Sequence, residues 1–276
     1  VMGLFSGLHT KVAVYMLYRL YVQLFDLEQR WNVLIIVIMI ISMMIGAFGG
    51  LAENSIRRVL GYQMLNGMPF ILVMLAFTSD DPRRALAAGI MYTIHHMVTV
   101  GSLILASGAI EETYGTGLLS KLSGLARRDP IIAWIFAAGA FSVVGFPPFS
   151  GMWGKLMIVF EIARVGGAWA WIAIAAIIIA SFAAFLAMLR VWRKVFWGKG
   201  LPEDKVPDEL VIRKKLMAPS AALILGSLCM FIFSGIVLDV VDAAAEQLLD
   251  TNAYTETVLG DEPIAVPTID EIQEGR

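Results

Sequence analysis

The stretch GFPPFSGMWGK, residues 145–155, separates two long apolar runs and contains two adjacent prolines, three glycines and a lysine. Prolines and glycines interrupt helices, so a membrane helix is expected to break here. The residues expected to form the break are Gly145, Pro147, Pro148 and Gly151. An amine in the bilayer core costs about 3 kcal/mol on insertion scales, and transporters place such groups beside broken helices. We therefore predict a discontinuous helix with a transport role for Lys155; the alternative is a kinked helix whose lysine extends to the membrane surface.

The composition assigns the class of protein. Of 276 residues, 58% are hydrophobic and 16% are charged, whereas soluble domains carry about 25% charged residues. The chain is therefore predicted to be a multi-pass membrane protein, with lipids and no nucleic acid among its partners. The single cysteine, Cys229, excludes an intrachain disulfide and a cysteine-based metal cluster.

Apolar runs of about 20 residues indicate membrane-spanning helices. They predict an all-α fold with about seven transmembrane helices, at approximately 2–27, 33–52, 60–78, 86–109, 130–165, 168–196 and 216–240. The fifth run is too long for one straight helix, as a discontinuous helix would be. The chain shows no signal peptide and begins within an apolar run, so we expect it to be a piece of a longer protein.

Basic residues predict the orientation. Twelve lysines and arginines fall on the face of the N-terminus and five on the opposite face, which makes the N-terminal face cytoplasmic by the positive-inside rule. We expect residues 1–249 to form the transmembrane bundle of an inner cell membrane protein, with a cytoplasmic loop at 197–215. Residues 250–276 are expected to form an acidic extracytoplasmic tail, and the chain from about residue 246 onward to be extended.

Lys11, His95 and His96 are predicted to lie at about the same depth as Lys155. At 1.5 Å per residue, each is about 13–15 Å from the nearer end of its span. Histidine titrates near neutral pH, and a lysine amine removed from water can also release and regain its proton. We therefore predict a lateral proton relay. The alternative role for the histidines is helix packing. The alternative for Lys11 is that its side chain extends to the membrane surface.

Two other possibilities concern neighbouring residues. Glu161, six residues after Lys155, is a secondary candidate for either a relay group or an interfacial carboxylate. A metal site is not favoured, because adjacent histidines diverge by about 100° on a helix and no further ligand lies near them in sequence. We expect no metal and no cofactor.

Four motifs carry a family resemblance: SGLHTKVAVY at 6–15, SIRRVLGYQ at 55–63, IHHMV at 94–98, and GFPPFSGMWGK at 145–155. In this order they resemble the antiporter-like membrane subunits of Mrp-type sodium/proton antiporters and respiratory complex I, with the Mrp D subunit as the nearest pattern. The resemblance implies the last half of a fourteen-helix fold whose C-terminus faces outward.

The resemblance also implies roles for individual residues. Lys11 corresponds to the family's lysine of the eighth helix, Lys155 to that of the broken twelfth, and the two histidines to the region between them on the eleventh. Family members commonly carry a lysine where this chain has Val100. The relay would then depend on water, the histidines, or the nearby Thr99 and Ser102.

The preferred hypothesis is a proton-translocating subunit of a multisubunit sodium/proton antiporter, a secondary transporter rather than an enzyme. Its partners would be the other subunits of an Mrp-type complex, protons and monovalent cations. The alternatives are a scaffold subunit that has lost part of the relay, as Val100 permits, and a proton-pumping subunit of a complex I-like or hydrogenase-type assembly.

Overall fold

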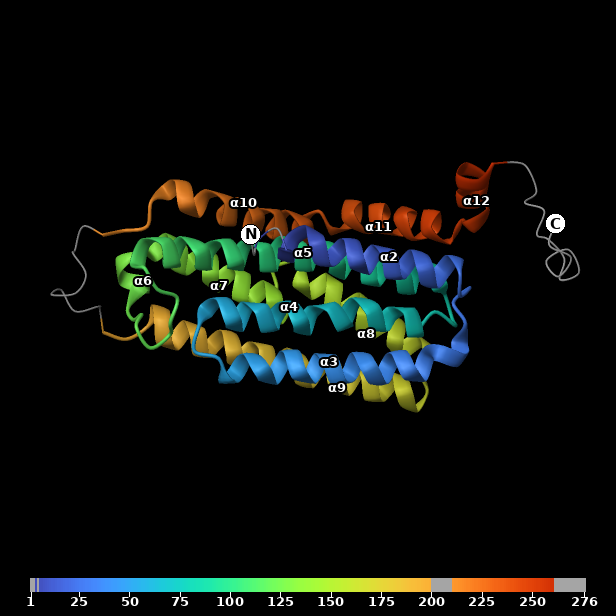
Figure 1. The fold of residues 1–276 in the computed structure, drawn as a ribbon, viewed down its shortest axis with the longest axis horizontal. Helices are drawn as coiled ribbons and strands as arrows, with labels where there is room; N and C mark the ends of the chain where they lie inside the picture. The colour runs from blue at the N-terminus through green and yellow to red at the C-terminus, as the bar shows by residue number, and fades with distance from the viewer. Residues whose placement is uncertain (1–2, 4, 200–209, 261–276) are drawn as a thin grey trace, which may run out of the picture.

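The computed structural model describes residues 3, 5–199 and 210–260 and forms an elongated bundle whose long helices run along one axis (Figure 1). The helices are α2 (Thr10–Gln23), α3 (Asn32–Ala52), α4 (Ile56–Leu72), α5 (Pro82–Tyr114), α6 (Leu125–Arg128), α7 (Pro130–Val144), α8 (Gly151–Val165), α9 (Gly167–Val191), α10 (Lys214–Ile232), α11 (Ser234–Leu249) and α12 (Thr251–Leu259). Short 3-10 turns at Gln29–Trp31 and Val73–Ala76, and π-helical turns at Phe5–His9 and Trp192–Phe196, extend four of them. Within these described residues there is no β-strand.

The predicted all-α membrane fold is confirmed. Within the part of the chain that the structure describes, five helical segments are long and apolar enough to cross a membrane, namely Gln29–Ala52, Ile56–Ala76, Pro82–Tyr114, Gly167–Phe196 and Lys214–Ile232. The two other predicted spans correspond to α2 with its preceding turn and to the pair α7 and α8, whose pieces are individually shorter. The orientation in the membrane stays a prediction.

The predicted break lies between α7 and α8, which run one after the other along the bundle (Figure 1). Gly145 ends α7 with a φ of 101°, a conformation that favours glycine. The Pro147–Pro148 peptide bond is cis. At Gly151, where α8 begins, a β-carbon would lie 1.9 Å from the Ser142 carbonyl oxygen, so only glycine permits this approach of α8 to α7.

The C-terminal region differs from the prediction in two ways. The span expected at 216–240 is interrupted at Phe233 and continues as α11 to Leu249, so a second helix is discontinuous. The segment expected to be extended from residue 246 is helical as far as Leu259, and the Asp250 side chain caps α12 by accepting from the Ala253 N–H at 3.0 Å. The predicted boundary at residue 249 stays a prediction, and residues 261–276 and 200–209 lie outside the described residues.

The buried apolar side chains form two clusters, one toward each end of the bundle. On α4, Val59 and Leu60 belong to one cluster and Phe70 and Ile71 to the other. On α5, Tyr92 and Val100 are divided in the same way. The core is therefore interrupted near the middle of the bundle, where α4 and α5 carry other kinds of residue.

Candidate functional site

A layer of buried polar side chains occupies the interval between the two apolar clusters. Its members are Lys11, Gln63, Asn66, His95, His96, Thr99, Ser102, Ser142, Ser150, Ser220 and Ser227. They come from α2, α4, α5, α7, α10 and the segment just before α8. Burying polar groups costs free energy unless they are hydrogen-bonded, so the contacts within this layer determine what it can do.

Lys11 forms a direct pair with His96. Its Nζ lies 2.9 Å from His96 Nδ1 and also donates to Thr10 Oγ1 at 3.2 Å, and its side chain is only 6% exposed. When Lys11 is protonated its amine can only donate, so Nδ1 accepts from it and the hydrogen of the neutral ring is then on Nε2. Nε2 lies 3.5 Å from the Gln63 carbonyl oxygen on α4. The Lys11–His96 pair thus bridges α2, α5 and α4.

A glycine makes room for this pair. A β-carbon on Gly67 of α4 would lie 1.9 Å from His96 Nε2, closer than any real contact. α4 can therefore approach the imidazole only because residue 67 has no side chain.

His95 belongs to a separate group, a closed ring of hydrogen bonds that we call the hydroxyl ring. His95 Nδ1 lies 2.9 Å from Ser150 Oγ and 3.3 Å from Thr99 Oγ1. From Thr99 the ring continues to Ser142 (2.9 Å), from Ser142 to Ser227 (2.9 Å), and from Ser227 back to Ser150 (2.8 Å). His95 Nδ1 has either a lone pair or a hydrogen, so it accepts from the Ser150 and Thr99 hydroxyl groups or donates toward them, and the orientation of the hydroxyls follows the tautomer of His95. The ring joins α5, α7, α10 and the break.

Lys155 turns toward the break rather than toward the membrane surface. Its Nζ donates to the carbonyl oxygen of Val144, the last residue of α7, at 2.8 Å, and to Ser181 Oγ on α9 at 2.9 Å. It also lies 5.2 Å from the centroid of the Phe70 ring. Because the break ends α7, the Val144 carbonyl has no partner further along that helix and is available to the amine.

The secondary candidates lie apart from these groups. Ser102 Oγ donates to the Ser220 carbonyl oxygen at 2.7 Å, which links α5 to α10. Glu161 pairs with Arg164 at 3.8 Å. Val100, where a lysine was expected from the resemblance, is fully buried in an apolar cluster.

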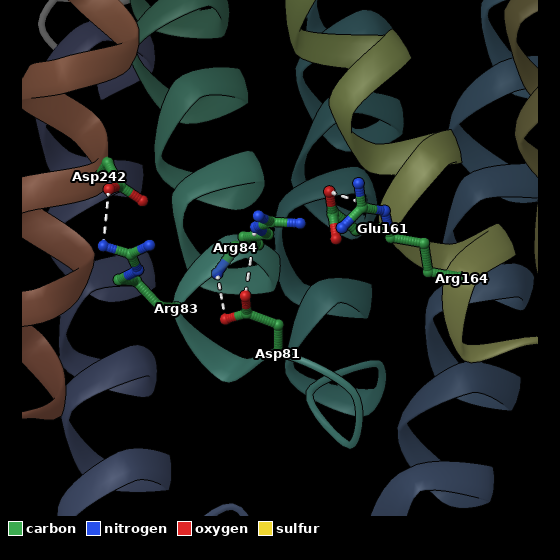
Figure 2. Close-up of polar contacts among 6 residues, drawn as sticks. All are labelled: Asp81, Arg83, Arg84, Glu161, Arg164 and Asp242. Carbon is green, nitrogen blue, oxygen red and sulfur yellow. Dashed lines mark hydrogen bonds and ion pairs between the residues drawn. The ribbon is translucent and has the colours of Figure 1, made fainter.

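Glu161 lies in a charged opening at the end of the bundle where α5 begins, shown in Figure 2. There Arg83 pairs with Asp242 of α11 at 3.0 Å, and Arg84 with Asp81 at 3.2 Å. An opening of about 340 Å³ is lined by residues of α5, α8 and α11, including Arg84, Met157, Glu161, Arg164, Asp239 and Asp242. Met157 is the lining residue of α8 nearest to Lys155 in sequence, and Lys155 itself does not line the opening.

Two buried amides complete the polar layer. Gln63 is 1% exposed, and neither its Nε2 nor its Oε1 has a hydrogen-bond partner among the described residues. The same holds for Asn66 Oδ1, one turn further along α4. Buried amides of this kind are usually satisfied by ordered water.

Sequence reasoning missed several residues of the site. Ser142, Ser150 and Ser227 make up most of the hydroxyl ring, and the Ser181 hydroxyl accepts a hydrogen bond from Lys155 Nζ. Single serines in apolar helices were the available signal. Such serines more often bond to their own helix, so the signal does not identify a site without the fold.

Comparisons with known proteins agree with this architecture. Residues 1–184 match the family described as "NADH:quinone oxidoreductase/Mrp antiporter, TM". The D subunit of the Na(+)/H(+) antiporter of Bacillus subtilis is 31% identical over 261 residues, which cover 94% of this chain and 51% of that protein. The N subunit of the NADH-quinone oxidoreductase of Hydrogenovibrio crunogenus is 30% identical over 75% of this chain and 42% of its own length.

A solved structure matches as well. A protein in the structure of the Mrp complex from a Dietzia species superposes with a TM-score of 0.86 at 32% identity, over 94% of this chain and 55% of that protein. The chain described here therefore spans about half the length of the relatives it matches. The polar layer, the break and these matches together show that the chain belongs to the NADH:quinone oxidoreductase/Mrp antiporter family of membrane proteins.

Proposed function

We propose that this chain is a proton-translocating part of a multisubunit sodium/proton antiporter of the Mrp type, and that Lys11, His96, His95 and Lys155 form its relay. The observation that carries the proposal is the contact of 2.9 Å between Lys11 Nζ and His96 Nδ1 inside the membrane bundle. Two titratable nitrogens in direct contact can exchange a proton without a conformational change. A histidine that served only in helix packing would not need such a contact with a lysine amine.

The relay begins at the Lys11–His96 pair. A proton passed from Lys11 to His96 Nδ1 makes the imidazole doubly protonated, and the ring then releases the hydrogen on Nε2. That hydrogen faces α4, where the Gln63 carbonyl oxygen lies at 3.5 Å. The histidine thereby moves a proton from one side of its ring to the other.

Water is expected to connect the three groups. Among the described residues no hydrogen bond joins the two imidazoles to each other, and none joins the hydroxyl ring to Lys155. The buried amides of Gln63 and Asn66 support hydration beside His96, because they need partners that neighbouring side chains do not provide. A change of His95 Nδ1 from acceptor to donor would be accompanied by rotation of the neighbouring hydroxyl groups, without movement of the imidazole ring.

The same proposal implies the partner subunits, the transported ions and the location of the chain. The matched relatives are subunits of larger assemblies, so we propose other Mrp-type subunits as partners and protons and monovalent cations as the transported ions. We also propose that the chain resides in the cell membrane with α6 on the cytoplasmic side and the tail outside, and that it is not a redox subunit.

The experiment compares variants of the assembled complex in membrane vesicles. Lys11→Ala and Lys155→Ala should each abolish sodium-driven proton movement, followed with a pH-sensitive dye, at normal levels of assembled complex. Thr113→Ala is the control, because Thr113 is a polar residue of α5 outside the polar layer whose hydroxyl donates to the Ala109 carbonyl oxygen of its own helix. Unchanged exchange in both lysine variants would refute the relay and favour a scaffold role, to which the buried Val100 already points.

The second candidate is a proton-pumping subunit of a complex I-like assembly, which the match to an N subunit of an NADH-quinone oxidoreductase supports. The relay residues would be the same, and the driving reaction would differ. Proton movement that depends on added NADH and quinone rather than on a sodium gradient would identify this candidate.

A further inference from the structure

A long apolar groove runs along the outer surface between α7 and α9. Its volume is about 510 Å³, and it is lined by residues that include Ala133, Trp134, Ala137, Phe185, Leu189 and Trp192. The α7 residues recur every three or four positions, as do those of α9, so each helix presents one continuous face to the groove. The small side chains of the α7 alanines leave space for the groove, and Trp134 at its edge is 76% exposed. The groove therefore faces outward from the bundle.

Both walls of the groove end in basic residues at the same end of the bundle. Arg193 follows Phe185 and Leu189 at four-residue spacing on the α9 wall, and Arg127 precedes the start of the α7 wall by three residues. The Gly124 N–H donates to the Trp197 carbonyl oxygen at 3.2 Å, which ties the two walls together there. Arg127 and Arg193 are exposed and form no ion pair within the described part of the chain.

We infer that this groove binds one anionic glycerophospholipid, with an acyl chain along α7 and α9 and the phosphate between Arg127 and Arg193. Charge complementarity favours this occupant: an apolar slot with one exposed arginine just beyond the end of each wall fits a ligand with a long apolar chain and an anionic phosphodiester head. Trp192 and Trp197 line the groove at the basic end, the level where indole rings meet lipid headgroups.

An apolar helix of a neighbouring subunit fits the same groove less well. Such a helix would fill the apolar slot but would offer no anionic group to the two exposed arginines, whereas an anionic lipid matches both parts of the site. The basic end is also the face predicted to be cytoplasmic, where anionic lipids attract basic residues. The lipid site is independent of the proposed proton relay.

The test is lipid retention by the purified complex, measured by native mass spectrometry after exchange into phosphatidylglycerol or phosphatidylethanolamine. The complex should retain phosphatidylglycerol, and the double variant Arg127→Gln/Arg193→Gln should weaken this retention at least about fivefold. Ala137→Trp, which fills the groove without changing charge, should remove the bound lipid of either kind.

The control is Arg58→Gln/Arg213→Gln, which removes the same number of positive charges from arginines that pair with Glu53 and Glu112 and do not adjoin the groove residues in sequence. It should leave phosphatidylglycerol retention unchanged. Equal retention by the groove variants and the unaltered complex would overturn the inference. So would a cross-link from position 137 to a helix of another subunit in the unaltered complex, because the groove would then hold protein.

Discussion

Lys11 and Lys155 are both lysines near the middle of the same bundle, yet their surroundings differ in kind. Lys11 contacts an imidazole nitrogen, a group that can itself take a proton. Lys155 contacts a backbone carbonyl and a serine hydroxyl, which accept hydrogen bonds but do not titrate near neutral pH. Lys11 therefore has a partner with which it can exchange a proton, whereas the partners of Lys155 only fix the position of its amine.

This difference suggests different tasks in the proposed relay. Lys11 can pass its proton directly to a neighbouring helix, while Lys155 must receive or release one through water. The predictions below test whether the two lysines differ in this way.

The largest effect is expected when each lysine is replaced by arginine. Arginine keeps the positive charge but does not release its proton, so both Lys11→Arg and Lys155→Arg should slow sodium-driven proton movement by about a hundredfold. The measurement is the initial rate of the pH-dye signal in vesicles with equal amounts of complex. If either arginine variant kept most of the activity, that lysine would act only as a fixed charge.

A substitution at Gly67, which changes neither lysine, should test the surroundings of Lys11 without altering those of Lys155. In Gly67→Ala the added β-carbon would overlap His96 Nε2, so the imidazole must move away from Lys11, and exchange should fall by about tenfold or more, equivalent to losing one strong hydrogen bond. Gly61→Ala is the control on the same helix, because no atom lies within 4 Å of its β-carbon. Equal rates in the two variants would show that the Lys11–His96 contact is not used.

A smaller effect is expected from the hydroxyl ring. Ser227→Ala removes one member, but His95 Nδ1 keeps Ser150 and Thr99 as partners. The loss should be about fivefold, as for a hydrogen bond of roughly 1 kcal/mol. Transport rate and thermal stability should be measured together, since a fall in the melting temperature without a fall in rate would make the ring purely structural.

The smallest effect is expected at Glu161. Its partner Arg164 lies at 3.8 Å near the surface, and such pairs contribute about 0–1 kcal/mol. Glu161→Gln should therefore change the exchange rate by less than about twofold, because water in the opening can carry protons past a neutral side chain. A loss as large as that of Lys155→Arg would make Glu161 an obligatory relay group.

The helices and the first break could be predicted from the sequence, because the length of an apolar run and its content of glycine and proline determine helix formation within that segment itself. Apolar runs gave the spans, and GFPPFSGMWGK contains residues that no continuous helix accommodates. The second break at Phe233 was not predicted, since phenylalanine is compatible with a helix and only the following Ser234 and Gly235 hint at an interruption. The short helix α12 was also missed, although Asp250 is a typical capping residue.

The polar layer was predictable only in part. Charged and imidazole groups in apolar runs are rare enough to identify Lys11, His95, His96 and Lys155. The pairing of Lys11 with His96 rather than with His95 depends on the rotation of α5, which the sequence does not specify. The role of Ser181 depends on α9 passing the break, a tertiary contact with no local signal.

Ser227 holds the break through two groups. Its hydroxyl belongs to the hydroxyl ring, and its backbone carbonyl accepts the Ser150 N–H at 3.2 Å. A movement of α10 along its axis would therefore displace Ser150 or break its hydrogen bonds to Ser227. In either case the contact between Ser150 Oγ and His95 Nδ1 would change. The position of one helix and the contacts of this imidazole are thus mechanically coupled.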